Sequence, residues 1–439
     1  MLFAVYAAVS VRDHQRILTT GFDLGIFEQG VRSYAHGHLP VSELKGPGFP
    51  LLGDHFSPIL ATLAPLYRLW PSPLVLLLAQ AALLALAVVP LTSWARRTAG
   101  RTTALAVAFG YGVSWGIAQA VGFDFHEVCF AVPLLAFSLT ALGEGRLPAA
   151  VGWALPLLLV KEDLGLTVAA IGVLVARRGR VRLGLTTCAI GVVGTLLEVL
   201  VIIPAFNPGG KFTYLDSLSS HQSSGPGLTE IVHTAASGLD VKSHTVVLLL
   251  APTALLALRS TLLWAALPTL GWRFLSHNPA YWGTDYHYSA VLMPIVFAAL
   301  IEAVATRPGG PRAARIQLAA GTAISDLLLP QFPLARLGEP ATWQTDPRTA
   351  AAHRVLNHIP DGATVAASNS LVPQLTNRTT VCEFGVPDSI PRSEWIIVDT
   401  TTQNWPTTRA QQTQDIAAAQ ARGYQTVDDQ DGYLLLHRP

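Results

Sequence analysis

Long apolar runs separated by short polar turns restrict the fold of this chain more than any other feature. A helix needs about 20 mostly apolar residues to cross the roughly 30 Å hydrocarbon core of a bilayer. Suitable runs fall near residues 73–94, 102–121, 127–142, 147–162, 164–177, 183–205, 244–259, 260–277, 288–306 and 313–331. The opening run, MLFAVYAAVSV, is shorter and is interpreted as the end of a first span. We therefore expect an α-helical polytopic membrane protein with about eleven transmembrane helices.

Composition favours the same class. Of the 439 residues, 51% are hydrophobic and only 13% are charged, whereas a soluble domain carries about 25% charged residues. The net charge of +1 lacks the basic excess of a nucleic-acid-binding protein. Glycines are scattered through the apolar runs, where small residues allow helices to pack closely in a membrane.

Arginines are concentrated in alternate connections between the predicted spans. They include Arg96, Arg97 and Arg101, then Arg146, and then Arg177, Arg178, Arg180 and Arg182. Cytoplasmic loops carry such an excess of Lys and Arg. The remaining connections therefore lie on the extracytoplasmic side.

Polar and ionisable clusters occupy those outer connections. They fall in residues 12–72, which form a large first outer loop, and in residues 122–128, 161–163, 206–243 and 276–289. Ionisable groups so close to hydrocarbon are costly unless they are paired, hydrated or functional. The asymmetry predicts a polar site on the outer face of a domain that spans residues 1–331.

Residues 332–439 are more polar and are expected to form a small extracytoplasmic α/β domain. Asp346 and Pro347 are typical of a helix start, and Gly423 of a helix end. Asp431-Gly432 predicts a turn before a last strand, YLLLH. Three further short buried strands are predicted at TVAAS, TTVCEF and EWIIVDT.

Asp23, in FDLGIFEQG, is the first candidate catalytic residue. A carboxylate at the mouth of a membrane cavity could accept a proton from an acceptor hydroxyl as a general base. Asp is also a favoured helix N-cap, so Asp23 could simply cap the helix that follows it. The two roles are compatible.

Asp54 and His55, together with Asp124, His126 and Glu127, complete the candidate catalytic set. Carboxylates and imidazole suit a divalent cation such as Mg²⁺ or Mn²⁺, and Asp54, Asp124 and His126 are the candidate ligands. No metal-binding spacing supports this assignment. The alternative is a hydrogen-bonded network that ties the outer loops together.

The triplet KED at residues 161–163 interrupts another apolar run. Lys161 could contact a lipid phosphate, with Glu162 or Asp163 positioning it or the acceptor, or the triplet could form an internal ion pair. Arg273 suits bidentate phosphate recognition, although snorkelling to lipid headgroups explains it equally well.

Asp285 and His287 repeat the acid-x-His pattern of Asp124 and His126 and are candidate substrate-binding residues. Aromatic side chains surround them and could form an interfacial belt or stack on sugar rings. These aromatic residues are Tyr281, Trp282, Tyr286 and Tyr288.

Several long, ordered segments resemble the DUF2079 family of bacterial predicted membrane proteins. They are FDLGIFEQ, GDHFSPILATLAPLYRLWPSPLVLLLAQ, FDFHEVCFAVPLLAF, KEDLGL, GTDYHY and IPDGATVAASNSLVPQLTNR. The wider architecture is similar to GT-C glycosyltransferases, which have many helices, an acidic first outer loop and a soluble outer C-terminal domain. This resemblance implies a polyprenyl-phosphate sugar donor and a general base at Asp23, with Asp54 as the second choice.

The function implied is transfer of a sugar from that lipid-linked donor to a cell-envelope glycan, lipid or protein. A transporter and a non-catalytic cell-envelope scaffold are the alternatives, although transporters usually place ionisable residues near the bilayer midplane. The enzyme hypothesis predicts one outer-facing cavity shared by eight side chains. These are Asp23, Asp54, His55, Asp124, His126, Glu127, Lys161 and Asp285.

Overall fold

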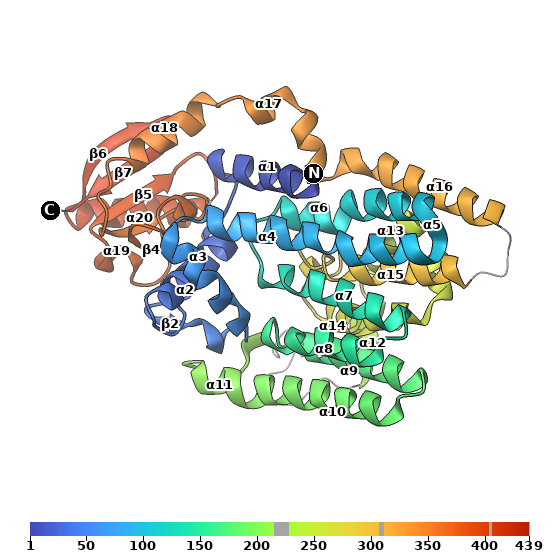
Figure 1. Ribbon diagram of the computed structural model, residues 1–439. Helices are drawn as coiled ribbons and strands as arrows, with labels where there is room; N and C mark the ends of the chain where they lie inside the picture. The colour runs from blue at the N-terminus through green and yellow to red at the C-terminus, as the bar shows by residue number, and fades with distance from the viewer. Residues whose placement is uncertain (215–227, 307–310, 404–405, 439) are drawn as a thin grey trace.

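The computed structural model describes residues 1–214, 228–306, 311–403 and 406–438. Helices form most of the first three quarters of the chain, and a small sheet follows them (Figure 1). The helices of the first part are α1 (Leu2–Gln15), α2 (Ile26–Ala35), α3 (Ala64–Leu69), α4 (Leu74–Leu86), α5 (Val88–Gly112), α6 (Trp115–Val121), α7 (Ala131–Gly143), α8 (Leu147–Ala154), α9 (Leu164–Arg177), α10 (Val181–Leu197), α11 (Ile203–Phe206), α12 (Leu228–Ala236), α13 (Leu239–Leu250), α14 (Leu267–Leu275), α15 (Leu292–Ala305) and α16 (Pro311–Leu328).

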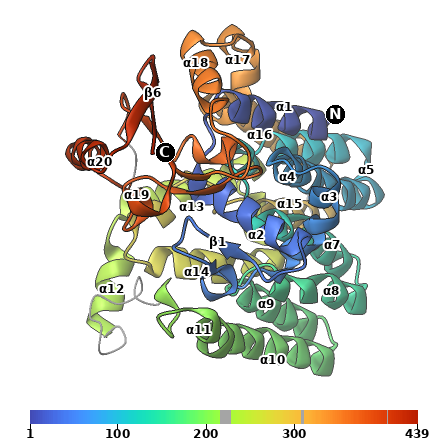
Figure 2. The same ribbon diagram turned by 90° about the vertical axis from the view of Figure 1, so that its left-hand side faces the viewer.

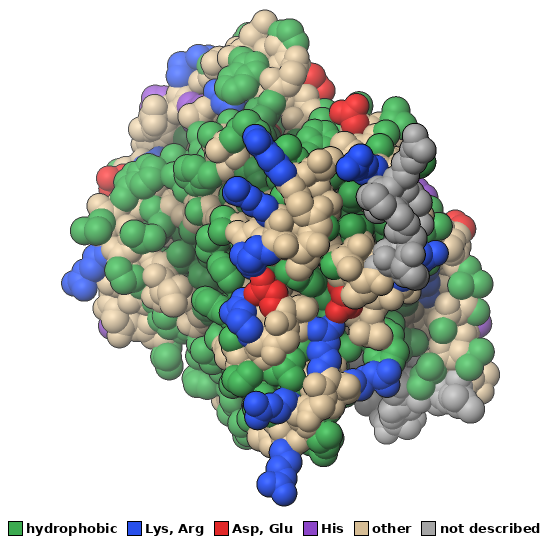
Figure 3. Space-filling view, turned by 45° about the vertical axis from the view of Figure 1, so that its right-hand side comes forward, with side chains coloured by type: hydrophobic (Ala, Val, Ile, Leu, Met, Phe, Trp, Pro, Cys, Tyr) green, Lys and Arg blue, Asp and Glu red, His purple; other side chains and the backbone are tan. Residues whose placement is uncertain are grey.

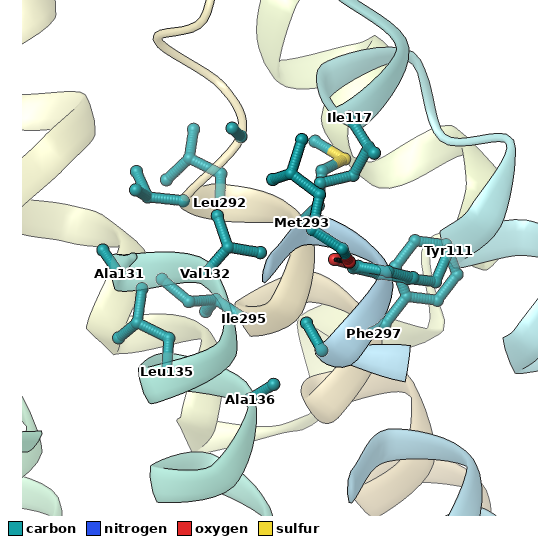
Figure 4. Close-up of a cluster of buried hydrophobic side chains, with 14 of the residues drawn as sticks. Tyr111, Ile117, Ala131, Val132, Leu135, Ala136, Leu292, Met293, Ile295 and Phe297 are labelled. Atoms are coloured by element: carbon teal, nitrogen blue, oxygen red, sulfur yellow. Dashed lines mark hydrogen bonds between the residues drawn. The ribbon is translucent and has the colours of Figure 1, made fainter. Parts of the chain in front are cut away.

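The core of the helical bundle is built around α15, which packs against α5 and α7. Phe297 of α15 meets Tyr111 of α5 edge to face, with ring centroids 6.0 Å apart. Val132 and Leu135 of α7 lie on the other side of the same core (Figure 4). The hydroxyl of Tyr111 donates to the carbonyl of Leu84, so its one polar atom is satisfied inside this apolar layer.

Among the described residues, two helical segments are long and apolar enough to cross a membrane, Leu74–Gly112 and Val181–Phe206. The first contains Gly100 with φ 85° and ψ 178°, a break that separates the runs predicted at 73–94 and 102–121. In the second segment, only 17% of the apolar stretch is buried in the protein. The rest forms an exposed apolar face that is suited to lipid. Four shorter apolar helical segments fall at Glu127–Gly143, Leu147–Leu159, Leu164–Arg177 and Leu292–Ala305. The count of eleven spans stays a prediction.

The arginine-rich turns meet at one end of the bundle. Arg97 and Arg146 both bind the carboxylate of Glu144, and Arg178 pairs with Glu302. Lys and Arg side chains gather in the middle of this face (Figure 3). The sheet lies at the opposite end of the bundle (Figure 1).

The predicted α/β unit is present. Its sheet has the order β4-β3-β5-β7-β6, with β3, β4 and β5 parallel and β7 antiparallel to both of its neighbours. The strands are β3 (Thr364–Ala367), β4 (Thr380–Glu383), β5 (Trp395–Asp399), β6 (Gln425–Gln430) and β7 (Tyr433–His437). The helices of this part are α17 (Pro340–Trp343), α18 (Pro347–Leu356), α19 (Ser389–Arg392) and α20 (Arg409–Ala421).

The local signals in this unit are confirmed. Asp346 caps α18 by accepting from the backbone N–H of Arg348, and Pro347 occupies the first turn. Gly423 adopts the left-handed conformation two residues after α20 ends. Asp431 and Gly432 also have positive φ between β6 and β7, as a tight hairpin turn requires.

Residues 12–72, the predicted first outer loop, pack directly onto the α/β unit. Ile17, Ile26 and Leu44 share one buried apolar cluster with Val365 and Leu371. The side chain of Gln29 donates to a carbonyl of β4, which fixes α2 beside the sheet. Figure 2 shows α2 and the short strand β1 (Val41–Ser42) between the sheet and the bundle. The domain boundary predicted after residue 331 therefore divides residues that share one apolar core.

Candidate active site

A cavity of about 350 Å³ opens where the first outer loop meets the bundle. Three kinds of side chain line it: ionisable groups, aromatic rings and a patch of aliphatic groups. The ionisable residues are Asp23, His55, His126, Glu127, Lys161, Glu162, Asp163 and His287, and the aromatic ones are Phe27, Phe212, Tyr214, Trp272, Tyr281 and Tyr288. Leu166, Leu196, Val199 and Thr195 complete the wall.

Asp23 reaches this cavity from a short π-helical turn, Gly21–Gly25, that precedes α2. Its Oδ2 lies 3.1 Å from Nε2 of His126, and 34% of the Asp23 side chain is accessible. Burial works to raise the pKa of Asp23, but neighbouring His126, Lys161 and His55 hold it below its ordinary value. The carboxyl is therefore ionised at neutral pH and can accept a proton. It does not cap the following helix through its side chain, because α2 has Gly25 at its N-cap.

Lys161 and Glu127 both line the cavity and form an ion pair, with 2.8 Å between Nζ and Oε1. Glu127 is fully buried, so its charge requires this cation. An internal ion pair within residues 161–163, one of the two alternatives for this triplet, is not formed. Asp163 instead accepts from the indole N–H of Trp272 at 2.9 Å.

His55 and Glu162 form a second acid–imidazole pair, with 2.7 Å between Nδ1 and Oε1. Burial works to lower the pKa of His55, but Glu162 raises it above its ordinary value. The other oxygen of Glu162 accepts from the backbone N–H of Phe56. The ring of Tyr214 stacks on His55 with centroids 4.5 Å apart, giving a flat aromatic wall.

His287 stacks on His126 with ring centroids 3.4 Å apart and an interplanar angle of 24°. Both rings are buried. The stack places His287 behind the residue that contacts Asp23. The structure thus joins the two acid-x-His segments through their histidines.

Arg273 does not line the cavity. It is fully buried, and its guanidinium donates to the carbonyls of Tyr281 and Gly283, each at 2.7 Å. A third bond, of 3.0 Å, goes to the hydroxyl of Ser289. Because all three guanidinium nitrogens donate to this loop, Arg273 holds residues 281–289 in place and is not presented to a phosphate.

The expected shared cavity is wrong for three of the eight side chains. Asp54 is absent from the cavity wall and pairs with Lys45 at 3.0 Å. Asp124 accepts from the backbone N–H and the hydroxyl of Thr20, at 2.9 and 2.6 Å. Asp285 is exposed at the surface and is absent from the cavity wall.

The candidate metal ligands do not converge either. Asp54, Asp124 and His126 each have a different partner, respectively Lys45, Thr20 and Asp23. Across residues 1–214, 228–306, 311–403 and 406–438, no group of three or more His, Cys, Asp or Glu side chains is arranged to hold a metal. These described residues do not fit a Mg²⁺ or Mn²⁺ site.

Two aromatic residues of the wall, Phe212 and Tyr214, were missed by sequence reasoning. They belong to the 206–243 connection, of which residues 215–227 lie outside the described residues. The only signal was their position in a predicted outer connection. Glu162 was expected to position Lys161 or the acceptor, whereas its side chain contacts His55.

Comparison with known proteins agrees with this architecture. The family model described as "Predicted membrane protein (DUF2079)" matches residues 13–435. The structure is similar to the crystal structure of ArnT from Cupriavidus metallidurans bound to undecaprenyl phosphate, with a TM-score of 0.61. The two chains are 14% identical over 99% of this chain and 97% of ArnT. No curated protein is significantly similar in sequence.

The similarity to ArnT shows that this chain has an ArnT-like fold. At this level of identity it shows the fold alone. The family match covers nearly the whole chain, including the α/β unit. The chain therefore belongs to the DUF2079 family of predicted membrane proteins.

Proposed function

We propose that this protein is a glycosyltransferase that moves a sugar from a polyprenyl-phosphate donor to an acceptor hydroxyl outside the cytoplasmic membrane. One observation carries the proposal: an ionised carboxylate, Asp23, contacts His126 in a cavity that also holds the Lys161–Glu127 pair. This cavity occurs in a fold shared with a protein that binds undecaprenyl phosphate.

The donor would enter from the lipid. Leu166 and Leu196 line the cavity and are also exposed on α9 and α10, so one wall of the site is continuous with the apolar outer surface. An isoprenoid tail could lie there while its phosphate approaches Lys161. An ammonium group is a suitable point charge for phosphate.

Asp23 would act as the general base. The acceptor hydroxyl gives its proton to the Asp23 carboxylate while its oxygen forms a bond to the anomeric carbon of the sugar. The bond between that carbon and the phosphate oxygen breaks, and polyprenyl phosphate leaves with the electron pair. Holding the donor and the base in one cavity keeps the reacting groups close and oriented, which raises the rate of sugar transfer.

The outer face is assigned from charge. The positive-inside rule favours a cytoplasmic position for the arginine-rich turns, and the α/β unit lies at the opposite end of the bundle. An enzyme on the outer face has no access to cytoplasmic nucleotide sugars, which favours a lipid-linked donor. Transport has less support, because the ionisable groups pair with one another where the first outer loop meets the bundle.

The test is sugar transfer by the purified protein in proteoliposomes that contain radiolabelled polyprenyl-phosphate sugars, with envelope glycans, lipids and proteins as acceptors. We expect label to move from at least one lipid-linked sugar and from no free nucleotide sugar. A folded protein that transfers from no lipid-linked donor to any acceptor class would contradict the proposal.

A further inference from the structure

The turn that carries Asp23 is held from two sides. On the side of the helical bundle, Asp124 accepts from the backbone N–H and hydroxyl of Thr20. On the other side, Asn369 binds the next two backbone amides. Its backbone carbonyl accepts from the N–H of Gly21 at 2.8 Å, and its side-chain Oδ1 accepts from the N–H of Phe22 at 3.0 Å. Three successive backbone amides directly before Asp23 are therefore fixed.

Asn369 belongs to the connection that leaves the carboxyl end of β3. In the order β4-β3-β5, the chain passes from β3 to β4 on one side and returns to β5 on the other. Parallel sheets with such a reversal bind ligands in the crevice at these carboxyl ends. Here the chain's own Gly21 and Phe22 contact the loop after β3.

The fit at this contact is tight. A Cβ added at Gly21 would lie 2.9 Å from Cβ of Val372 and 3.0 Å from Oδ1 of Asn369. At Gly25 it would lie 2.9 Å from Leu44 and 3.0 Å from Val372. Glycine on both sides of Asp23 lets the α/β unit approach the backbone of the turn directly.

The turn depends on such support because it is not a regular helix. Phe22 has φ −86° and ψ 89°, which is non-helical. No side-chain capping bond stabilises the turn at Thr20. The Thr20 hydroxyl lies close to the carbonyl of Phe22 within the turn, and Asp124 and Asn369 bind the turn from outside it.

We propose that Asn369 is a positioning residue, through which the C-terminal α/β unit sets the place of Asp23 in the cavity. This inference rests on the proposed function, because it assigns the α/β unit a part in the same reaction. Asn369 acts through the backbone of Gly21 and Phe22 and touches neither donor nor acceptor. Reacting groups misplaced by about 1 Å lose about 100-fold in rate.

The experiment uses the full chain in lipid nanodiscs and compares Asn369→Ala with native protein. Asn377→Ala is the matched control, because Asn377 contacts the carbonyl of Pro71 from the same unit. Hydrogen–deuterium exchange is measured on the peptide that contains residues 19–24, and kcat and KM are measured for the lipid-linked donor. Asn369→Asp keeps an oxygen acceptor at the same position.

We expect Asn369→Ala to speed amide exchange at Phe22 at least about tenfold and to lower kcat about 10- to 100-fold, with little change in KM. Asn369→Asp restores the exchange protection, and Asn377→Ala changes neither quantity. Should alanine lower the melting temperature, Asn369→Ser provides the same comparison in a folded chain.

Unchanged exchange at Phe22, or unchanged kcat in an active enzyme, would overturn the inference. The two proposals fail separately. If native protein transfers no sugar while Asn369→Ala still speeds exchange, the support of the turn by the α/β unit stands and the transferase assignment fails.

Discussion

Nε2 of His126 lies 3.1 Å from Oδ2 of Asp23, although the two residues come from different connections between apolar helices. The ring of His126 is buried and the Asp23 carboxylate is partly open to the cavity. The imidazole therefore lies on the protein side of the carboxylate and leaves its other oxygen for an incoming hydroxyl. This relationship is the basis of the proposed chemistry.

Replacing His126 should move the pH dependence of transfer. Because His126 helps to hold the pKa of Asp23 below its ordinary value, His126→Ala should raise that pKa. The acidic limb of kcat/KM should then shift to higher pH, and activity should fall. The measurement is a pH–rate profile. His38→Ala, at an exposed position, is the matched control, and a profile that coincides with that of native protein would remove His126 from the mechanism.

Lys161→Met should destabilise the protein as well as weaken donor binding. It leaves the fully buried Glu127 carboxylate without its cation, which costs about 3–5 kcal/mol. The double variant Lys161→Met/Glu127→Gln should recover the melting temperature but not donor affinity. Recovery of both would show that Lys161 has only a structural role.

Glu28 should make stability depend on pH. It is fully buried, and it accepts hydrogen bonds from Tyr67 and Thr376, the latter in the α/β unit. Burial raises its pKa from 4.5 to about 7. Between these values the folded protein keeps a proton that the unfolded chain loses, so stability should fall as pH rises through this window.

Glu28→Gln should remove this slope. Thermal unfolding in detergent across pH 4.5 to 7 measures the effect, with Glu339→Gln at an exposed position as the control. A native melting temperature that is flat or rises with pH, relative to the Gln variant, would contradict the assignment.

Gly184→Ala should loosen the pairing of α9 and α10. The added Cβ would lie 2.5 Å from the carbonyl oxygen of Gly172, and overpacking of this kind costs about 1–3 kcal/mol. Because Leu166 and Leu196 of these helices line the cavity, donor KM should rise as the melting temperature falls. Gly152→Ala in α8, where an added Cβ meets nothing within 4 Å, should change neither.

Much of the fold could be predicted because its signals are local. Apolar runs predicted the helices of the bundle, and Asp346 and Pro347 predicted the start of α18. The edge strand β6 was missed because QTVDDQ is mostly polar, without the alternation that predicts a strand. Its position depends on the turn at Asp431 and Gly432 and on pairing with β7.

The site was only partly predictable for a different reason. Asp23, Glu127 and Lys161 stood out as ionisable groups beside apolar runs, and all three line the cavity. Asp124 and His126 are two positions apart, yet Asp124 has φ 41° and binds Thr20 while His126 faces Asp23. Side-chain direction in an irregular loop follows from tertiary contacts, which no spacing in the sequence specifies.

The most direct test of the central claim compares sugar transfer by native protein, Asp23→Asn and Asp54→Asn in the same proteoliposomes. Asp23→Asn keeps the shape of the side chain but cannot accept the proton, so transfer should fall at least about 100-fold while donor binding persists. Asp54→Asn, which removes the ion pair with Lys45 and leaves the cavity wall intact, should stay close to native activity. Equal transfer by native protein and Asp23→Asn would contradict the assignment of Asp23 as the base.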